Sequence, residues 1–331
     1  MHMEIAKALI LASGRGTEQP WPTAPAPRPL FPVANRPIIF HQLEALRAAG
    51  VLEVAILAEE HEQAAIEEAV GDGRRWGVAV VYPEAPRTPC LAAALNAGEG
   101  FMRGEPVLIQ PGGVLLRDHI HAHISTFARE QLDALALRLP GPRAVAEVEP
   151  SPGYLLSPRA VSILREPSDG RTDPLAGIRA CGGRVRVEQV DGCLSCHGDL
   201  QILLESNRRV LETLAPAPSP AHVRGCSIQG PVSIDPTAHV SGTLVRGPAI
   251  IGPGAHITDA YVGPYSSIGA YVTIEATEIE HSIVLPHAEL RFVGTRLESS
   301  VIGAGARVVR DFGLPAAIRM SIGNGGEVVL R

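Results

Sequence analysis

The chain has 331 residues and 45% of them are hydrophobic, which is enough for two domains with a sizeable core. The formal net charge of −6 argues against a nucleic-acid-binding surface, because such a surface needs a basic stripe. No apolar run reaches the roughly 18–20 residues of a membrane span, and the N-terminal apolar stretch is too short for a secretory signal. We therefore expect a cytoplasmic protein with no nucleic-acid or membrane partner.

The first two-thirds of the chain alternates between predicted strands and helices. The predicted strands are 6–12, 54–57, 78–82 and 106–110, and the predicted helices are 38–49, 61–70, 90–101 and 200–214. This alternation is typical of a mostly parallel sheet covered by helices on both faces. We expect a Rossmann-like α/β domain over residues 1–214, followed by a stiff, Pro-rich linker over residues 215–224.

Residues 225–331 contain an internal repeat. Ile234, Ile251 and Ile268 are 17 residues apart, and two further aliphatic series, beginning at Val240 and Val245, have the same period. One inward-pointing aliphatic residue per short strand, with Gly, Pro or Asp at the corners, describes a triangular coil. Such coils must stack to bury their apolar sides. The pattern predicts a left-handed β-helix of about five coils rather than a β-sandwich.

A glycine- and proline-rich loop over residues 14–37 joins the first strand to the first helix. It is entered through Leu11-Ala-Ser-Gly-Arg-Gly-Thr, whose small residues let backbone N–H groups approach phosphate oxygens. It is closed by Leu30-Phe-Pro-Val-Ala-Asn-Arg-Pro-Ile. The two motifs resemble those of the sugar-1-phosphate nucleotidyltransferases, L-A-x-G-x-G-T-R-L and P-K-P-x-x-P-V-x-N-x-P, with matching spacing. The resemblance implies a nucleotide site that comprises Leu11, Ala12, Ser13, Gly14, Gly16, Thr17 and Arg28.

The resemblance covers nearly the whole chain. Residues 192–207 align without a gap with the family segment G-Y-W-x-D-I-G-T-P-E-D-Y-x-x-A-N. Residues 262–269 and 279–285 are similar to the β-helix of the long-form glucose-1-phosphate thymidylyltransferases. The resemblance implies transfer of a nucleotide to a sugar 1-phosphate, with Mg²⁺ held by carboxylates.

Several charged residues of the family are replaced at the aligned positions. Glu18 stands where the family has a triphosphate-binding arginine, and Arg28 stands where it has a lysine. Gly113 and Cys196 occupy the positions of the two metal-binding aspartates, and a thiol is a poor Mg²⁺ ligand. We therefore predict that standard nucleotidyl transfer has been lost and assign no catalytic or metal-binding residue.

Two groups of residues suggest other chemistry. Cys193-Leu-Ser-Cys-His197 matches a haem-attachment motif and offers zinc ligands, but buried free thiols are the simpler interpretation. Asp118-His-Ile-His-Ala-His123 suggests a metal site, and a surface helix that starts with an Asp118 cap is the alternative.

Three functions remain open. The first is a pseudoenzyme that binds a nucleotide or sugar nucleotide and acts as a homo-oligomer, or as a hetero-oligomer with an active paralogue. The second is an active nucleotidyltransferase that uses Mg²⁺ at a site rebuilt around Glu84, Asp191 or Asp199. The third is an interaction protein with a closed cleft.

Overall fold

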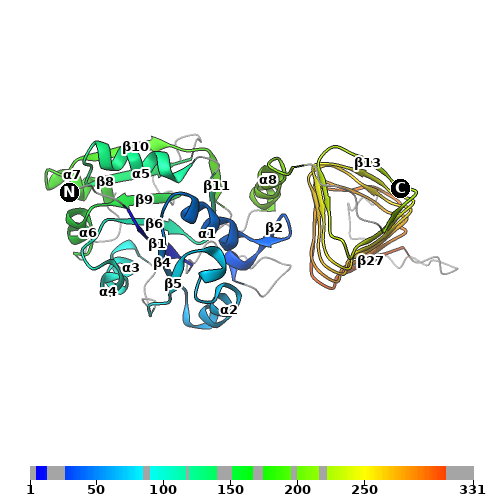
Figure 1. Cartoon of the computed structure of the whole chain (residues 1–331), viewed down its shortest axis with the longest axis horizontal. Helices are drawn as coiled ribbons and strands as arrows, with labels where there is room; N and C mark the ends of the chain where they lie inside the picture. The colour runs from blue at the N-terminus through cyan, green and yellow to red at the C-terminus, as the bar shows by residue number, and fades with distance from the viewer. Residues whose placement is uncertain are drawn as a thin grey trace, which may run out of the picture.

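The computed structural model has an α/β part and a coiled β part, joined beside one helix (Figure 1). It describes residues 5–12, 27–84, 90–116, 119–139, 151–166, 174–194, 200–215 and 222–310, with the side chains of residues 193–194 excepted. None of the helices in these ranges is long and apolar enough to cross a membrane.

A seven-stranded sheet forms the centre of the α/β part. Its strands are β1 (Lys7–Leu11), β4 (Glu53–Leu57), β5 (Ala79–Val81), β6 (Val107–Pro111), β8 (Ala134–Arg138), β9 (Gly153–Leu156) and β10 (Val185–Gln189). They lie in the order β10-β8-β9-β6-β1-β4-β5, and only β9 runs antiparallel to its neighbours. The mostly parallel sheet predicted from the sequence is thereby confirmed. Two small antiparallel pairs accompany it, β2 (Pro32–Val33) with β3 (Arg36–Pro37) and β7 (Val114–Leu116) with β11 (Gly192–Leu194).

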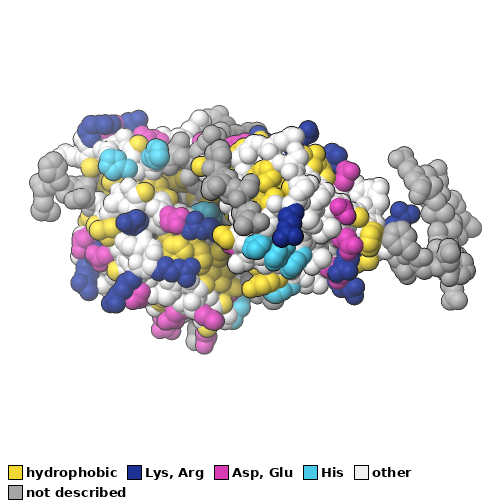
Figure 2. Space-filling view, turned by 45° about the vertical axis from the view of Figure 1, so that its right-hand side comes forward, with side chains coloured by type: hydrophobic (Ala, Val, Ile, Leu, Met, Phe, Trp, Pro, Cys, Tyr) yellow, Lys and Arg dark blue, Asp and Glu magenta, His cyan; other side chains and the backbone are white. Residues whose placement is uncertain are grey.

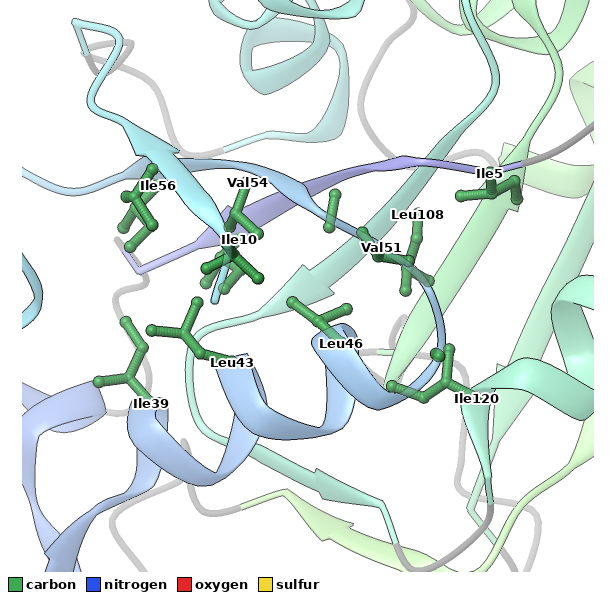
Figure 3. Close-up of a cluster of buried hydrophobic side chains, with 14 of the residues drawn as sticks. Ile5, Ile10, Ile39, Leu43, Leu46, Val51, Val54, Ile56, Leu108 and Ile120 are labelled. Carbon is green, nitrogen blue, oxygen red and sulfur yellow. The ribbon is translucent and has the colours of Figure 1, made fainter. Parts of the chain in front are cut away.

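Helices cover both faces of this sheet. One face packs against α1 (Ile38–Ala48), α2 (Glu60–Val70) and α5 (Ile120–Arg129), and the other against α3 (Leu91–Ala97), α4 (Glu99–Met102), α6 (Pro158–Leu164) and α7 (Pro174–Ala180). Figure 3 shows Ile39, Leu43 and Leu46 of α1 pointing toward Ile10 and Val54 of the sheet. This spacing of three to four residues places one apolar stripe of α1 against the core.

The single helix predicted over residues 90–101 is wrong in one respect. It is divided into α3 and α4 at Gly98, which ends the first helix and starts the second. A Cβ atom at Gly98 would lie 3.3 Å from the Leu9 side chain, so the break accompanies close packing of the chain on β1.

The C-terminal part is a coil of short parallel strands, consistent with a left-handed β-helix. Its strands are β12 (Val223–Arg224), β13 (Ser227–Gln229), β14 (Val232–Ile234), β15 (His239–Ser241), β16 (Leu244–Arg246), β17 (Ala249–Ile251), β18 (His256–Thr258), β19 (Tyr261–Val262), β20 (Ser266–Ile268), β21 (Thr273–Glu275), β22 (Glu278–Glu280), β23 (Ile283–Val284), β24 (Glu289–Arg291), β25 (Leu297–Glu298), β26 (Val301–Ile302) and β27 (Arg307–Val309). They form stacked sheets of six, five and five strands. Ile234 pairs with Ile251 and Ile251 with Ile268, as the 17-residue repeat predicts. The apolar side chains of all three sheets meet in one interior cluster.

Helix α8 (Leu200–Leu211) lies between the two parts, with the β2–β3 hairpin at its side (Figure 1). A shared apolar cluster joins the hairpin, α8 and the β-helix. It contains Phe31 and Ile38 at the hairpin, Leu203 and Leu204 of α8, and Ile283 of the β-helix. The predicted linker over residues 215–224 falls mostly outside the described ranges, and β12 occupies its last two residues. The domain boundaries remain a prediction.

Candidate functional site

The predicted nucleotide site begins at the C-terminal ends of β1 and β6. Leu11 ends β1 and pairs with Leu57 on one side and Pro111 on the other. The chain then leaves the sheet at Ala12, whose backbone N–H donates a hydrogen bond of 2.7 Å to the Leu57 carbonyl. Ligands in open α/β sheets bind at this edge, so the loop emerges where a ligand is expected.

The loop exit returns to the same point. Gly112, in the turn after β6, donates a hydrogen bond of 2.7 Å to the Leu11 carbonyl. A Cβ atom at Gly112 would lie 2.9 Å from Ala12 Cα and 3.1 Å from Pro29 Cγ. Only glycine lets the loop entry, the loop exit and the end of β6 approach this closely. These contacts bring together segments that are about 100 residues apart in the sequence.

The loop exit is also fixed to the β-helix. The β2–β3 turn has Ala34 and Asn35 at positive φ, a conformation in which Asn is common. The Asn35 side chain reaches out of this turn and donates a 2.6 Å hydrogen bond to the Ile268 carbonyl. The hairpin that closes the nucleotide loop therefore rests directly on a coil of the β-helix.

Asn207 of α8 is the centre of this junction and is fully buried. Its Oδ1 accepts hydrogen bonds from the Ala34 backbone N–H at 2.9 Å and from the Ser267 hydroxyl at 2.7 Å. Its Nδ2 donates to the Tyr265 carbonyl at 3.0 Å. One amide thus joins the hairpin, α8 and the β-helix. Asn207 is the last residue of the family segment aligned over residues 192–207, but the sequence alone gave no indication of this role.

Behind the β6 end lies a cavity of about 230 Å³, lined partly by α1, β7 and α8. Gln42 is buried at its wall and donates hydrogen bonds to Gln110 Oε1 at 3.3 Å and to the Pro111 carbonyl at 3.1 Å. His41 lies against the Val33 carbonyl, and its burial lowers its pKa below the usual value. This burial favours a neutral imidazole that holds α1 to the hairpin.

Comparisons with known proteins agree with this architecture. A nucleotidyl transferase family model matches residues 7–147. A glucose-1-phosphate thymidylyltransferase of Streptomyces griseus is 31% identical, and the match covers 96% of this chain and 98% of that protein. The chain belongs to the sugar-1-phosphate nucleotidyltransferase family.

A further relative and a solved structure are similar to this chain. The low-salt glycan biosynthesis nucleotidyltransferase Agl11 of Haloferax volcanii is 29% identical, over 98% of this chain and all of its own length. A Bacillus anthracis crystal structure, described as a glucose-1-phosphate thymidylyltransferase in complex with sucrose, superimposes with a TM-score of 0.53. That match has 19% identity and covers 64% of this chain and 97% of the other, and it supports the fold alone.

The structure describes only part of the nucleotide-binding set that the sequence predicts. Leu11, Ala12 and Arg28 are described, whereas Ser13, Gly14, Gly16, Thr17 and Glu18 lie outside the described residues. Arg28 starts the short helix η1 (Arg28–Leu30), which precedes the hairpin. Its positive charge acts on Glu62 of α2, but burial of Glu62 is the larger effect and raises the pKa of that carboxyl above its usual value. Arg28 thus faces a carboxylate on a neighbouring helix.

The two positions predicted to correspond to the family's metal-binding aspartates are Gly113 and Cys196. Gly113 is buried in the turn between β6 and β7 and donates a 3.0 Å hydrogen bond to the Pro111 carbonyl. Cys196 lies outside the described residues, as does Asp199. Asp191 is hydrogen-bonded to the Arg209 guanidinium, which also pairs with Glu205 at 2.9 Å. Within the described ranges, no three His, Cys, Asp or Glu side chains are grouped to hold a metal ion.

The three histidines at the start of α5, His119, His121 and His123, differ in burial. His123 is buried and its Nδ1 lies 2.6 Å from Glu188 Oε2, whereas His121 is exposed. Asp118, the predicted cap, lies outside the described residues. His119 occupies the N-cap position, and its side chain makes no capping hydrogen bond. His123 thus lies on the buried face of α5 and contacts Glu188 of β10, whereas His119 and His121 are exposed. The side chains of Cys193, Cys196 and His197 lie outside the described residues.

Proposed function

We propose that this family member has lost standard nucleotidyl transfer and binds a nucleotide or sugar nucleotide as a non-catalytic, regulatory subunit. The single observation that carries the proposal is the joint replacement of three family charges by Glu18, Gly113 and Cys196. The reaction brings two phosphate-bearing anions together, so it requires cations on the phosphates and carboxylates on the metal.

The electrostatic consequence of these replacements is large. Two like unit charges about 4 Å apart repel by roughly 4 kcal/mol near a protein surface. A carboxylate at residue 18 therefore opposes a triphosphate that the family's arginine would attract. Gly113 has no side chain to bind a metal ion, although its turn still packs against the start of the loop.

The neighbouring carboxylates offer limited compensation. Asp191 already has a guanidinium partner in Arg209, so metal binding there would compete with this ion pair. Glu84 follows β5 and is exposed, at the same edge of the sheet as the loop. It is the described residue on which a rebuilt metal site would depend.

The preserved backbone shape supports binding without catalysis. Gly112 keeps the loop entry and exit together, and Asn207 and Asn35 hold the closing hairpin. A binding subunit needs this shape, whereas only a catalytic subunit needs the metal. The β-helix supplies a further surface for association, as a homo-oligomer or with an active paralogue.

Two measurements on the full-length protein test the proposal. Nucleotide-sugar formation is assayed with several nucleoside triphosphates and sugar 1-phosphates, with Mg²⁺ and with Mn²⁺. Calorimetric titration follows the same triphosphates and nucleotide sugars. We expect saturable binding with no turnover above the enzyme-free control, and tighter triphosphate binding after Glu18→Arg.

Each other result selects a different function. Turnover that increases with protein purity contradicts the proposal. If Glu84→Gln abolishes this turnover and the exposed control Glu68→Gln does not, the site has been rebuilt around Glu84. Absence of both binding and turnover rejects the proposal in favour of a purely structural protein.

A further inference from the structure

One face of the β-helix carries a ladder of three histidines. His222, His239 and His256 are 17 residues apart, so each occupies the same position on successive coils. Their rings lie 4.9 Å apart between His222 and His239, and 4.9 Å apart between His239 and His256. This distance matches the spacing of about 4.7–4.9 Å between neighbouring strands, so the ladder follows directly from the stacking of coils.

The ladder lines an open cavity of about 430 Å³. Arg224, Ser241 and Thr258 complete the polar side of this cavity, and the two hydroxyl oxygens lie 3.3 Å apart. Figure 2 shows histidine side chains gathered beside a Lys or Arg side chain on the β-helix. Guanidinium, imidazole and hydroxyl groups all donate hydrogen bonds, so the cavity wall is rich in donors.

The charge on this face is uneven along the coil axis. Toward the C-terminal end of the same sheet, Arg291 pairs with Glu289 at 2.7 Å and Arg307 also pairs with Glu289 at 2.7 Å. At the N-terminal end, in contrast, none of the ion pairs of the described residues on this sheet involves Arg224 or the three histidines. The outward positions of β12, β15 and β18 contain no acidic residue at all. Among the described residues, the charge of Arg224 therefore has no carboxylate partner, and it borders the open cavity.

We propose that this histidine–arginine cavity is a binding site for a phosphate group carried by a small molecule. Arg224 can bind two oxygens of one phosphate, a geometry that matches the guanidinium fork. The imidazoles and the two hydroxyls then provide donors to the remaining oxygens. A metal ion is disfavoured, because the described His, Cys, Asp and Glu side chains form no group arranged to hold one.

The site is separate from the nucleotide cleft. The residues that contact α8 and the hairpin, including Ser267, Ile268 and Ile283, belong to a different sheet of the β-helix. The phosphate site therefore stands independently of the proposed function, and loss of catalysis in the cleft would leave it intact.

Inorganic phosphate, and then a phosphate monoester such as glucose 6-phosphate, is titrated into the full-length protein at constant ionic strength. Binding is followed by calorimetry and by the ring Cε1–H resonances of the histidines in NMR. Single Gln variants of His222, His239 and His256 assign these resonances. We expect the three ladder resonances to shift with phosphate and not with an equal ionic strength of chloride.

Matched variants test whether the effect is local. Arg224→Gln and the double variant His239→Gln/His256→Gln should weaken phosphate binding at least tenfold. Arg307→Gln removes a positive charge from the same sheet but from an ion-paired position, and should change the affinity less than twofold. The proposal is overturned if Arg307→Gln weakens binding as much as Arg224→Gln. It is also overturned if the ladder resonances stay in place, which would locate any bound phosphate elsewhere.

Discussion

Replacement of Asn207 by alanine tests how the nucleotide loop is held against the β-helix. The substitution removes one acceptor and one donor from a fully buried position. The Ala34 N–H and the Ser267 hydroxyl lose their partner, and both residues are buried. The Tyr265 carbonyl also loses a donor, but its residue is half-buried, so water can replace that contact more easily.

The cost follows from these contacts. A buried polar group left without a partner costs about 1–3 kcal/mol, and two such groups are created here. We therefore expect the free energy of unfolding to fall by about 2–6 kcal/mol. The loss should appear first where the two parts of the chain meet, because the three hydrogen bonds of Asn207 all reach residues outside its own helix.

Urea unfolding measures the loss of free energy of unfolding, and hydrogen exchange shows whether the loss is located at the junction of the two parts. Ser206→Ala is the matched control, since Ser206 is equally buried and its hydroxyl bonds to the Ile202 carbonyl within the same helix at 2.7 Å. Asn207→Ala should accelerate exchange in residues 31–38 and separate the unfolding of the two parts, whereas Ser206→Ala should do neither. Equal destabilisation by both variants, with unchanged exchange in the hairpin, would refute the role of Asn207 as a junction.

Two further predictions concern the α/β part. Gly112→Val should lower the free energy of unfolding, measured by urea titration, by about 1–3 kcal/mol, because the added atoms collide with Ala12 and Pro29. The control Gly100→Ala adds a methyl group in open space and should be neutral or slightly stabilising in the same titration. Burial, together with two neighbouring carboxylates, raises the pKa of Tyr82 to about 12. Its contribution to stability is therefore complete below pH 10 and is lost as the pH rises toward about 12, because the unfolded chain releases this proton first. Absorbance titration of the phenolate, compared with Tyr82→Phe, should show one tyrosine that ionises late, and a normal titration would contradict this assignment.

The repeat and the strand–helix alternation were accessible from the sequence because they depend on local rules. A 17-residue period fixes which aliphatic residues point inward, and the structure pairs Ile234 with Ile251 in that register. Other local patterns indicated β1, which is a short apolar run, and helix α1, whose apolar residues recur at the spacing of one helical face. The division at Gly98 was missed because it accompanies packing on Leu9, a residue remote in the sequence.

The candidate site is less accessible to sequence, since its contacts join distant segments. Motif spacing located the loop and the replaced charges, including Gly113 and Glu18. It gave no indication that Asp191 would meet Arg209, because that pairing depends on how α8 lies against β11.

The sequence by itself determined the two architectures and the family, and it predicts the positions at which the family's charges are replaced. The tertiary structure alone decided that Asn207 joins three elements. It also decided that Arg307 pairs with Glu289, whereas Arg224 meets no carboxylate among the described residues. The 17-residue spacing of His222, His239 and His256 is visible in the sequence, but this spacing does not show which charged side chains lie beside the histidines. Side-chain direction along one strand is a local property. Charge balance and buried hydrogen bonding depend on which distant residues share the same space.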